Sequence, residues 1–173
     1  MNQRALLLVN RHARRGQTDL SRAIDRLREL DFELLEVPLE SSEQISKVIR
    51  QHKDAVDLVI IGGGDGTLNA AIDGLIATQL PLGILPLGTA NDLARTLQLP
   101  TSLAEACDVI AKGQLERIDL GCVNGNHFFN VASLGLGLKI TQRLSRDIKL
   151  RWGVFAYAIA AMQVLIKSVP FAA

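Results

Sequence analysis

Four glycines surround a carboxylate in the segment Gly62-Gly63-Gly64-Asp65-Gly66-Thr67. Glycine lets the backbone turn sharply and approach a ligand without interference from a Cβ atom. The segment follows a short apolar run and opens a helical pattern, so the first N–H groups of that helix and the positive end of its dipole face an anion site. We therefore predict a phosphate-binding loop, against the simpler alternative of a tight turn without a ligand.

This loop differs from two common phosphate-binding loops. A Walker A loop needs a lysine followed by serine or threonine, and the segment has neither pair. A dinucleotide-binding loop needs a third glycine where Thr67 stands, and it follows the first strand, whereas this loop follows the third apolar run. Thr67 is expected either to cap the following helix or to present its hydroxyl to a phosphate.

Asp65 is the unusual residue of the loop. A carboxylate among phosphate-facing amides would repel the ligand unless a cation such as Mg²⁺ stands between them. Alternatively, Asp65 accepts a proton from an attacking hydroxyl group. A purely structural hydrogen bond to the N–H groups of its own loop is the third interpretation, and the sequence leaves all three open.

A second loop, Pro86 to Asp92, follows the next apolar run in the same way. Thr89 and Asp92 have the spacing of a helix-capping box with Asp in place of Glu, which accounts for these two residues but not for Gly88 and Asn91. Loops after consecutive parallel strands lie side by side at the carboxyl edge of the sheet, where ligands of α/β proteins bind. We therefore expect the two loops to form one cleft for the phosphates of a nucleotide.

Short apolar runs alternate with helical patterns through the first two-thirds of the chain. We expect strands near residues 5–9, 33–37, 58–61 and 82–85, and helices near 20–30, 45–49, 68–75, 93–97 and 102–111. The third run, Leu58 to Ile61, has no polar face, as in a parallel sheet covered on both sides. Repeated βα units connect through right-handed crossovers. The pattern predicts an α/β fold with a doubly wound, mainly parallel sheet.

The pattern changes near Leu115. Apolar and polar residues then alternate, Asn124-Gly125 is a strong hairpin turn, and residues 127–131 can return as the partner strand. We place the nucleotide-binding domain at residues 1–114 and the beginning of a second, β-rich domain at residues 115–173. A hairpin and two helices are too little for an independent β domain, so we expect this second domain to be truncated.

Composition indicates a globular protein with an aliphatic core. Of 173 residues, 48% are apolar and 21% charged, and the formal net charge of +1 gives no case for nucleic-acid binding. Cys107 and Cys122 form no CxxC pair, so neither a zinc site nor a disulfide framework is expected. The apolar run from Trp152 to Ile166 is shorter than the ~20 residues of a spanning helix, which favours a core helix over a membrane-surface helix.

The segments IGGGDGTLNAAIDGL and LGILPLGTANDLARTLQLP, within Leu58 to Pro100, resemble the diacylglycerol kinase catalytic-domain family, especially its bacterial lipid kinases. Residues Ile118 to Gly137 resemble the start of that family's second domain. The first strand departs from the family pattern, because Asn10 is followed by Arg11 instead of proline.

The resemblance implies a lipid kinase of phospholipid metabolism that transfers the γ-phosphate of ATP to the hydroxyl of a diacylglycerol-like lipid, with Mg²⁺ as cofactor. Asp65 is the expected catalytic residue, and no residue is assigned as a protein ligand of a metal. The expected ATP-binding residues are Asn10, Gly62, Gly63, Gly64, Asp65, Gly66, Thr67, Leu68, Asn69, Gly88, Thr89, Asn91 and Asp92.

In the family, the lipid cleft, a structural Mg²⁺ site and the proposed general base belong to the second domain, which would lie beyond Ala173. We therefore expect nucleotide binding and little or no turnover from this chain alone. The expected location is cytoplasmic, with peripheral contact to the lipid substrate at the inner membrane face and association with a second copy. Two alternatives stay open: a kinase of a soluble metabolite, similar to NAD kinases or phosphofructokinases, and a non-catalytic nucleotide-binding module.

Overall fold

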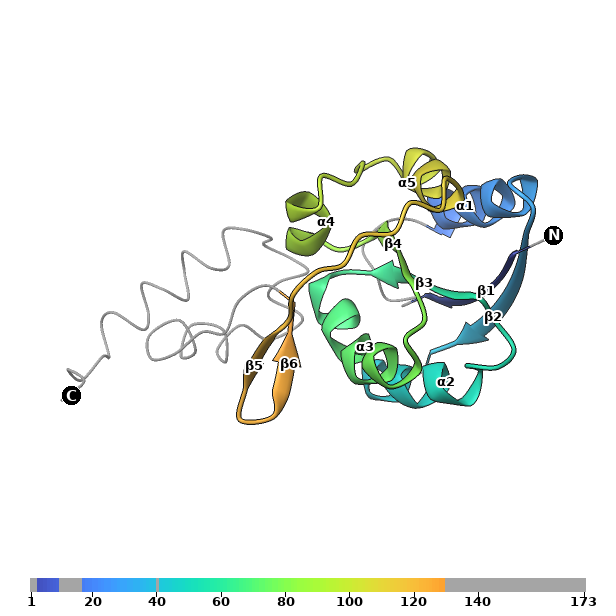
Figure 1. The fold of residues 1–173 in the computed structure, drawn as a ribbon. Coiled ribbons are helices and arrows are strands. Elements are labelled where there is room, and N and C mark those ends of the chain that lie inside the picture. Colours follow the sequence, from blue (N-terminus) through green and yellow to red (C-terminus); the bar gives the residue numbers. More distant parts are fainter. Residues whose placement is uncertain (1–2, 10–16, 40, 130–173) are drawn as a thin grey trace. The chain divides into compact units, whose positions relative to one another are not determined.

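The computed structural model describes residues 3–9, 17–39 and 41–129, all of which fall in one compact unit. Figure 1 shows their order along the chain. The strands are β1 (Gln3–Val9), β2 (Phe32–Pro38), β3 (Leu58–Gly63), β4 (Leu82–Pro86), β5 (Gly121–Val123) and β6 (Asn126–Phe128). The helices are α1 (Gln17–Glu29), α2 (Ile45–Gln51), α3 (Asp65–Thr78), α4 (Asp92–Thr96) and α5 (Leu103–Ala111), with a short 3₁₀ turn at Ser42–Gln44.

The first four strands form one parallel sheet in the order β2-β1-β3-β4. The chain leaves β1 toward β2 on one side, then returns past β1 to build β3 and β4 on the other. The strand order therefore reverses between β1 and β3, which is the topological switch point of a doubly wound sheet. The predicted α/β fold with a doubly wound parallel sheet is confirmed.

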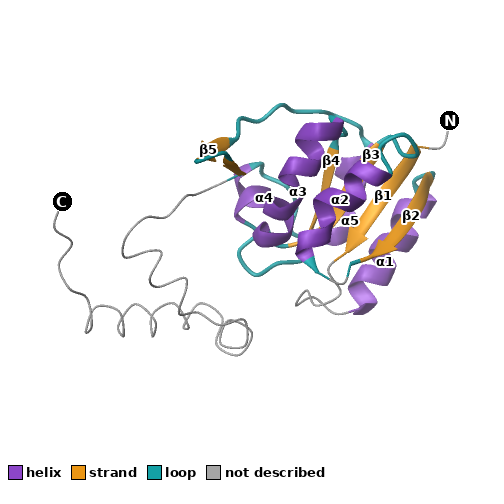
Figure 2. Cartoon of the chain, turned by 90° about the horizontal axis from the view of Figure 1, so that it is seen from below, coloured by secondary structure: helices purple, strands orange, loops and turns teal. Residues whose placement is uncertain are grey.

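Helices cover both faces of this sheet (Figure 2). Alternate residues of each strand point to opposite faces, so Leu7 and Ile60 pack with α1 and α5, whereas Leu8 and Ile61 pack with α2, α3 and α4. All four side chains are at most 2% exposed. Full burial of such a side chain contributes about 1.5–3 kcal/mol, which explains why β1 and β3 carry no polar face.

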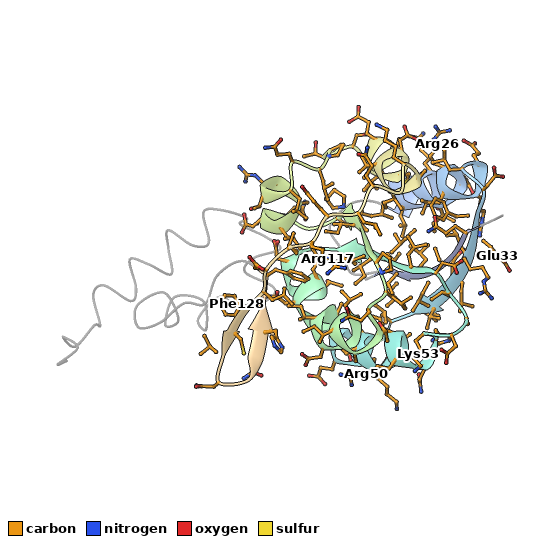
Figure 3. All side chains as sticks on the ribbon, in the orientation of Figure 1. Arg26, Glu33, Arg50, Lys53, Arg117 and Phe128 are labelled. Atoms are coloured by element: carbon orange, nitrogen blue, oxygen red, sulfur yellow. The ribbon has the colours of Figure 1, made fainter. Side chains whose placement is uncertain are left out.

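An ion pair joins the two helices on the α1 face of the sheet. Nη2 of Arg26, labelled in Figure 3, lies 2.9 Å from Oδ1 of Asp108 on α5. The same helices meet through the buried residues Ala23 and Cys107. Burial raises the pKa of the Cys107 thiol to about 11, as expected for a thiol that serves packing.

The hairpin predicted at Asn124-Gly125 is present as β5 and β6, which pair antiparallel. Both turn residues have positive φ, at 50° and 78°, as a two-residue hairpin turn requires. The link before it, residues 114–120, contains no helix or strand, and Leu115 is 77% exposed. The predicted helix at 152–166 lies outside the described residues. Within the described ranges, no helix is long and apolar enough to cross a bilayer.

Candidate functional site

The two glycine loops touch each other through their backbones. β3 and β4 pair Gly63 with Pro86, and the N–H of Leu87 donates a 3.0 Å hydrogen bond to the carbonyl of Gly63. A Cβ atom built on Gly88 would lie 2.5 Å from the Cα of Gly64, well inside van der Waals contact. The structure therefore brings the two predicted loops together at the carboxyl edge of the sheet.

Three of the four glycines in the first loop lie against atoms of the protein itself, so a side chain at any of them would press on a neighbour. A Cβ on Gly62 would lie 3.0 Å from the side chain of Leu87, and one on Gly64 would lie 3.0 Å from the Cα of Gly88. One on Gly63 would lie 2.6 Å from the Cβ of Thr67, which folds back over it and is 7% exposed.

Gly66 is different, because the packing does not require it. No described atom lies within 4 Å of a Cβ built there, the residue is exposed, and its φ lies outside the left-handed region. Glycine in a helix also costs about 0.5–1 kcal/mol relative to alanine. The absence of a side chain at Gly66 leaves bare backbone at the exposed first turn of α3.

Helix α3 begins at Asp65, ahead of the helix expected near residues 68–75, with Gly64 as an extended N-cap. The N–H groups of Thr67 and Leu68 donate to the Gly64 carbonyl at 2.9 and 3.1 Å. Thr67 is therefore inside the helix, and the expectation that it caps α3 is wrong. Its position is explained by the contact with Gly63.

Asp65 joins the two loops. Its Oδ1 accepts a 3.1 Å hydrogen bond from the backbone N–H of Leu93, in the first turn of α4. An N-terminal helical N–H of this kind normally bonds the side chain of the helix's own N-cap residue. Here the carboxylate comes from the preceding βα unit, so Asp65 ties the first loop to the second. The bond connects the start of α3 to the start of α4.

Asn91 braces the second loop from within. It adopts a left-handed conformation with φ 51°, and its Nδ2 donates to the Gly88 carbonyl at 3.0 Å. Its Oδ1 atom is buried and has no hydrogen-bond partner among the described residues. Asn91 is also the N-cap of α4, which begins at Asp92. The capping box predicted for Thr89 and Asp92 is therefore wrong, because the left-handed turn at Asn91 delays the start of the helix until after Thr89.

The remaining predicted residues divide by exposure. Thr89 and Asp92 are exposed on the second loop, where a ligand can reach them. Leu68 is 1% exposed and belongs to the core, so only its backbone can contribute to a site. Asn69 is exposed, and its Oδ1 accepts a 3.2 Å hydrogen bond from the N–H of Phe129. Asn10 lies outside the described residues and directly follows β1, whose last residue pairs with Gly62.

The loops lie where α/β sheets bind ligands, at the carboxyl ends of β3 and β4 and beside the switch point between β1 and β3. Nowhere in the described part of the chain do three or more His, Cys, Asp or Glu residues gather as a group that could hold a metal ion. The donors on offer are backbone amides and small polar side chains, which suit phosphate oxygens.

Residues 4–123 match the family model of the diacylglycerol kinase catalytic domain. The chain belongs to this family. It is 37% identical over 122 residues to a diacylglycerol kinase of Staphylococcus saprophyticus, covering 69% of this chain and 40% of that protein. It is 36% identical over 159 residues to a probable lipid kinase of Yersinia enterocolitica, covering 88% and 54%. The chain thus spans about half the length of the curated relatives it matches.

The fold of this family member is also similar to a solved relative. A crystal structure of a diacylglycerol kinase from Bacillus anthracis aligns with a TM-score of 0.68 at 34% identity, covering 74% of this chain and 50% of that chain. The resemblance of the two glycine loops to the family is therefore confirmed.

Two contacts of the site were not expected from the sequence, namely those made by the N–H groups of Leu93 and Phe129. Both donors are main-chain groups, which every residue except proline carries. Residue type therefore holds no signal for them. Only the side-chain acceptors, Asp65 and Asn69, stand out in the sequence.

Proposed function

We propose that this chain binds ATP along the two glycine loops and forms the nucleotide-binding portion of a lipid kinase. The reaction would transfer the γ-phosphate to the hydroxyl of a diacylglycerol-like lipid at a membrane surface. Membership of the diacylglycerol kinase family and the names of the relatives support the reaction class. The observation that carries the proposal is the backbone contact between Gly64 and Gly88, which aligns two amide-rich turns into one continuous edge.

The residues present fit a polyphosphate. The first turn of α3 combines a helix N-terminus with the bare backbone of Gly66. No atom of the described residues lies within 4 Å of a Cβ built on Gly66, so this space is open to a ligand. Thr89 adds an exposed hydroxyl from the second loop. We assign phosphate contacts to these groups and propose the same role for Asn10, the residue that follows β1 in the sequence.

Mg²⁺, when bound, would neutralise charge on the phosphates during transfer. We propose that the nucleotide phosphates supply most of its ligands, and that Asp65 is the carboxylate of the first loop that faces the ion or accepts the hydroxyl proton. The exposed carboxylate of Asp92 would repel phosphate without a cation nearby. Phosphoryl transfer depends mainly on position and charge, and the two loops would supply the position.

Calorimetric titration with ATP and MgCl₂ tests the binding step, with Gly66→Ala as the diagnostic variant. Because the protein leaves that Cβ position open, the variant should melt at the same temperature as the parent chain or higher. Its ATP affinity should nevertheless fall. An unchanged affinity would show that the first turn of α3 does not face the phosphates.

Labelled ATP tests the reaction, offered with diacylglycerol in mixed micelles, with NAD and with a sugar phosphate. We expect the complete product of the gene to transfer phosphate to the lipid. We propose that residues 1–114 bind the nucleotide and that residues 115–173 begin the lipid-side domain. Transfer only to NAD or a sugar phosphate would establish a soluble-metabolite kinase. ATP binding without transfer to any acceptor would establish a non-catalytic module.

A further inference from the structure

The hairpin is anchored to the helix that follows the first glycine loop. The Oδ1 atom of Asn69 accepts a 3.2 Å hydrogen bond from the N–H of Phe129, which lies 60 residues further along the chain. One turn later on the same helix, Oδ1 of Asp73 lies 3.5 Å from Nδ1 of His127. Residues four apart share one face of a helix, so a single face of α3 holds both β6 and the segment that leaves it.

The N–H of Phe129 has its hydrogen-bond acceptor on α3 and not on the partner strand of the hairpin. The last cross-strand pair is Gly121 with Phe128, so Phe129 lies beyond the ladder. The ring of Phe128, labelled in Figure 3, covers Gly121, where a Cβ atom would collide with it. Phe129 is half-buried and packs against the core cluster on the α3 face of the sheet. Asn69 thus sets where the chain leaves the hairpin.

Asn69 lies very close in sequence to the residues that shape the two loops. Asp65, one turn earlier on α3, holds the first turn of α4, and Thr67 covers Gly63 in the phosphate loop. The first two turns of α3 therefore contact the first loop, the second loop and the hairpin. A ligand that orders this part of α3 would also order the acceptor for Phe129.

We propose that Asn69 is a positioning residue, whose side chain docks the hairpin on α3 and so couples hairpin docking to occupancy of the nucleotide loops. The coupling rests on the proposed function, whereas the docking does not. By linkage, ATP should strengthen docking by the same factor by which docking strengthens ATP binding. One net hydrogen bond limits that factor to roughly two- to tenfold.

Amide hydrogen exchange at Phe129 measures the docking directly. Asn69→Ala removes the acceptor, and Asn69→Asp keeps a carboxylate oxygen in its place. We expect Phe129 to exchange roughly two- to tenfold faster in the alanine variant and at nearly the parent rate in the aspartate variant. Equal exchange rates in the parent chain and the alanine variant would overturn the docking.

Adding ATP and MgCl₂ measures the coupling. ATP should slow exchange at Phe129 in the parent chain and leave it unchanged in Asn69→Ala. A third variant, Gly125→Val, strains the hairpin turn at φ 78° and leaves Asn69 in place, so its ATP affinity should fall by a few-fold.

Two outcomes would overturn the coupling in distinguishable ways. If Asn69→Ala lowers ATP affinity while Gly125→Val does not, Asn69 contacts the nucleotide directly. If the parent chain binds no ATP, the proposed function and the coupling both fail. The exchange difference between the alanine and aspartate variants would still decide the docking.

Discussion

Gly88→Ala is the sharpest test of the contact between the two loops. The new Cβ atom would lie 2.5 Å from the Cα of Gly64 and 2.6 Å from Oδ1 of Asn91. Non-bonded carbon atoms pack at about 3.5–4.0 Å, so the loops would have to separate by roughly 1 Å. Neither neighbour can yield easily, because one is backbone and the other is held by the 3.0 Å bond from Asn91 Nδ2 to the Gly88 carbonyl.

The cost should appear in both stability and binding. Overpacking of this kind costs about 1–3 kcal/mol, and each kcal/mol lowers the melting temperature of a chain of this size by roughly 2–4 °C. Separation of the loops also misaligns the groups proposed to hold the phosphates. We expect the ATP affinity of Gly88→Ala to fall by at least about tenfold, or about 1.4 kcal/mol.

Differential scanning fluorimetry and calorimetric titration with ATP would measure the two effects. Gly83→Ala is the matched control, since it is the same change on β4, the strand that leads into the second loop, with the flexible side chain of Ile110 at 3.1 Å as its nearest neighbour. The control should lose a little stability and keep its ATP affinity. If Gly88→Ala binds ATP as tightly as Gly83→Ala does, the loop contact does not shape the nucleotide site.

Three further predictions follow from other parts of the structure. Gly74→Ala places a Cβ atom 2.8 Å from the Cα of Ser46, so α2 and α3 must separate and thermal melting should show a loss of about 1–3 kcal/mol; an unchanged melting temperature would contradict this packing. Asp65→Asn keeps an oxygen acceptor for Leu93, so it should fold normally while phosphoryl transfer by the complete gene product falls by about 100-fold or more. Near-normal turnover would remove the carboxylate charge from the mechanism. Burial raises the pKa of Cys107 from 9.0 to about 11, so its contribution to stability is complete below about pH 9 and is lost as the pH rises toward 11. At pH 8 a thiol reagent should label exposed Cys122 and spare Cys107 until the chain unfolds, and equal labelling rates would refute its burial.

The sequence by itself determined the framework of this protein. Runs such as Leu58 to Ile61 are apolar at every position, which is typical of a strand covered on both faces, and the alternation with helical patterns predicted the doubly wound sheet. The glycine loops and their resemblance to the diacylglycerol kinase family were equally visible. These features are local, since they depend on residue type, spacing and the geometry of single elements.

Only the tertiary structure decided how the site is held together. It placed the Asp65 carboxylate on the N–H of Leu93, the Asn69 carboxamide on the N–H of Phe129, and the start of α4 after the left-handed Asn91. The first two are hydrogen bonds between a side chain and the backbone of a different element. The start of α4 belongs with them, because its first turn is held by Asp65 and not by the capping residues expected from the local sequence. Main-chain donors look alike in any sequence, and a capping pattern cannot show that a distant carboxylate will reach the helix first.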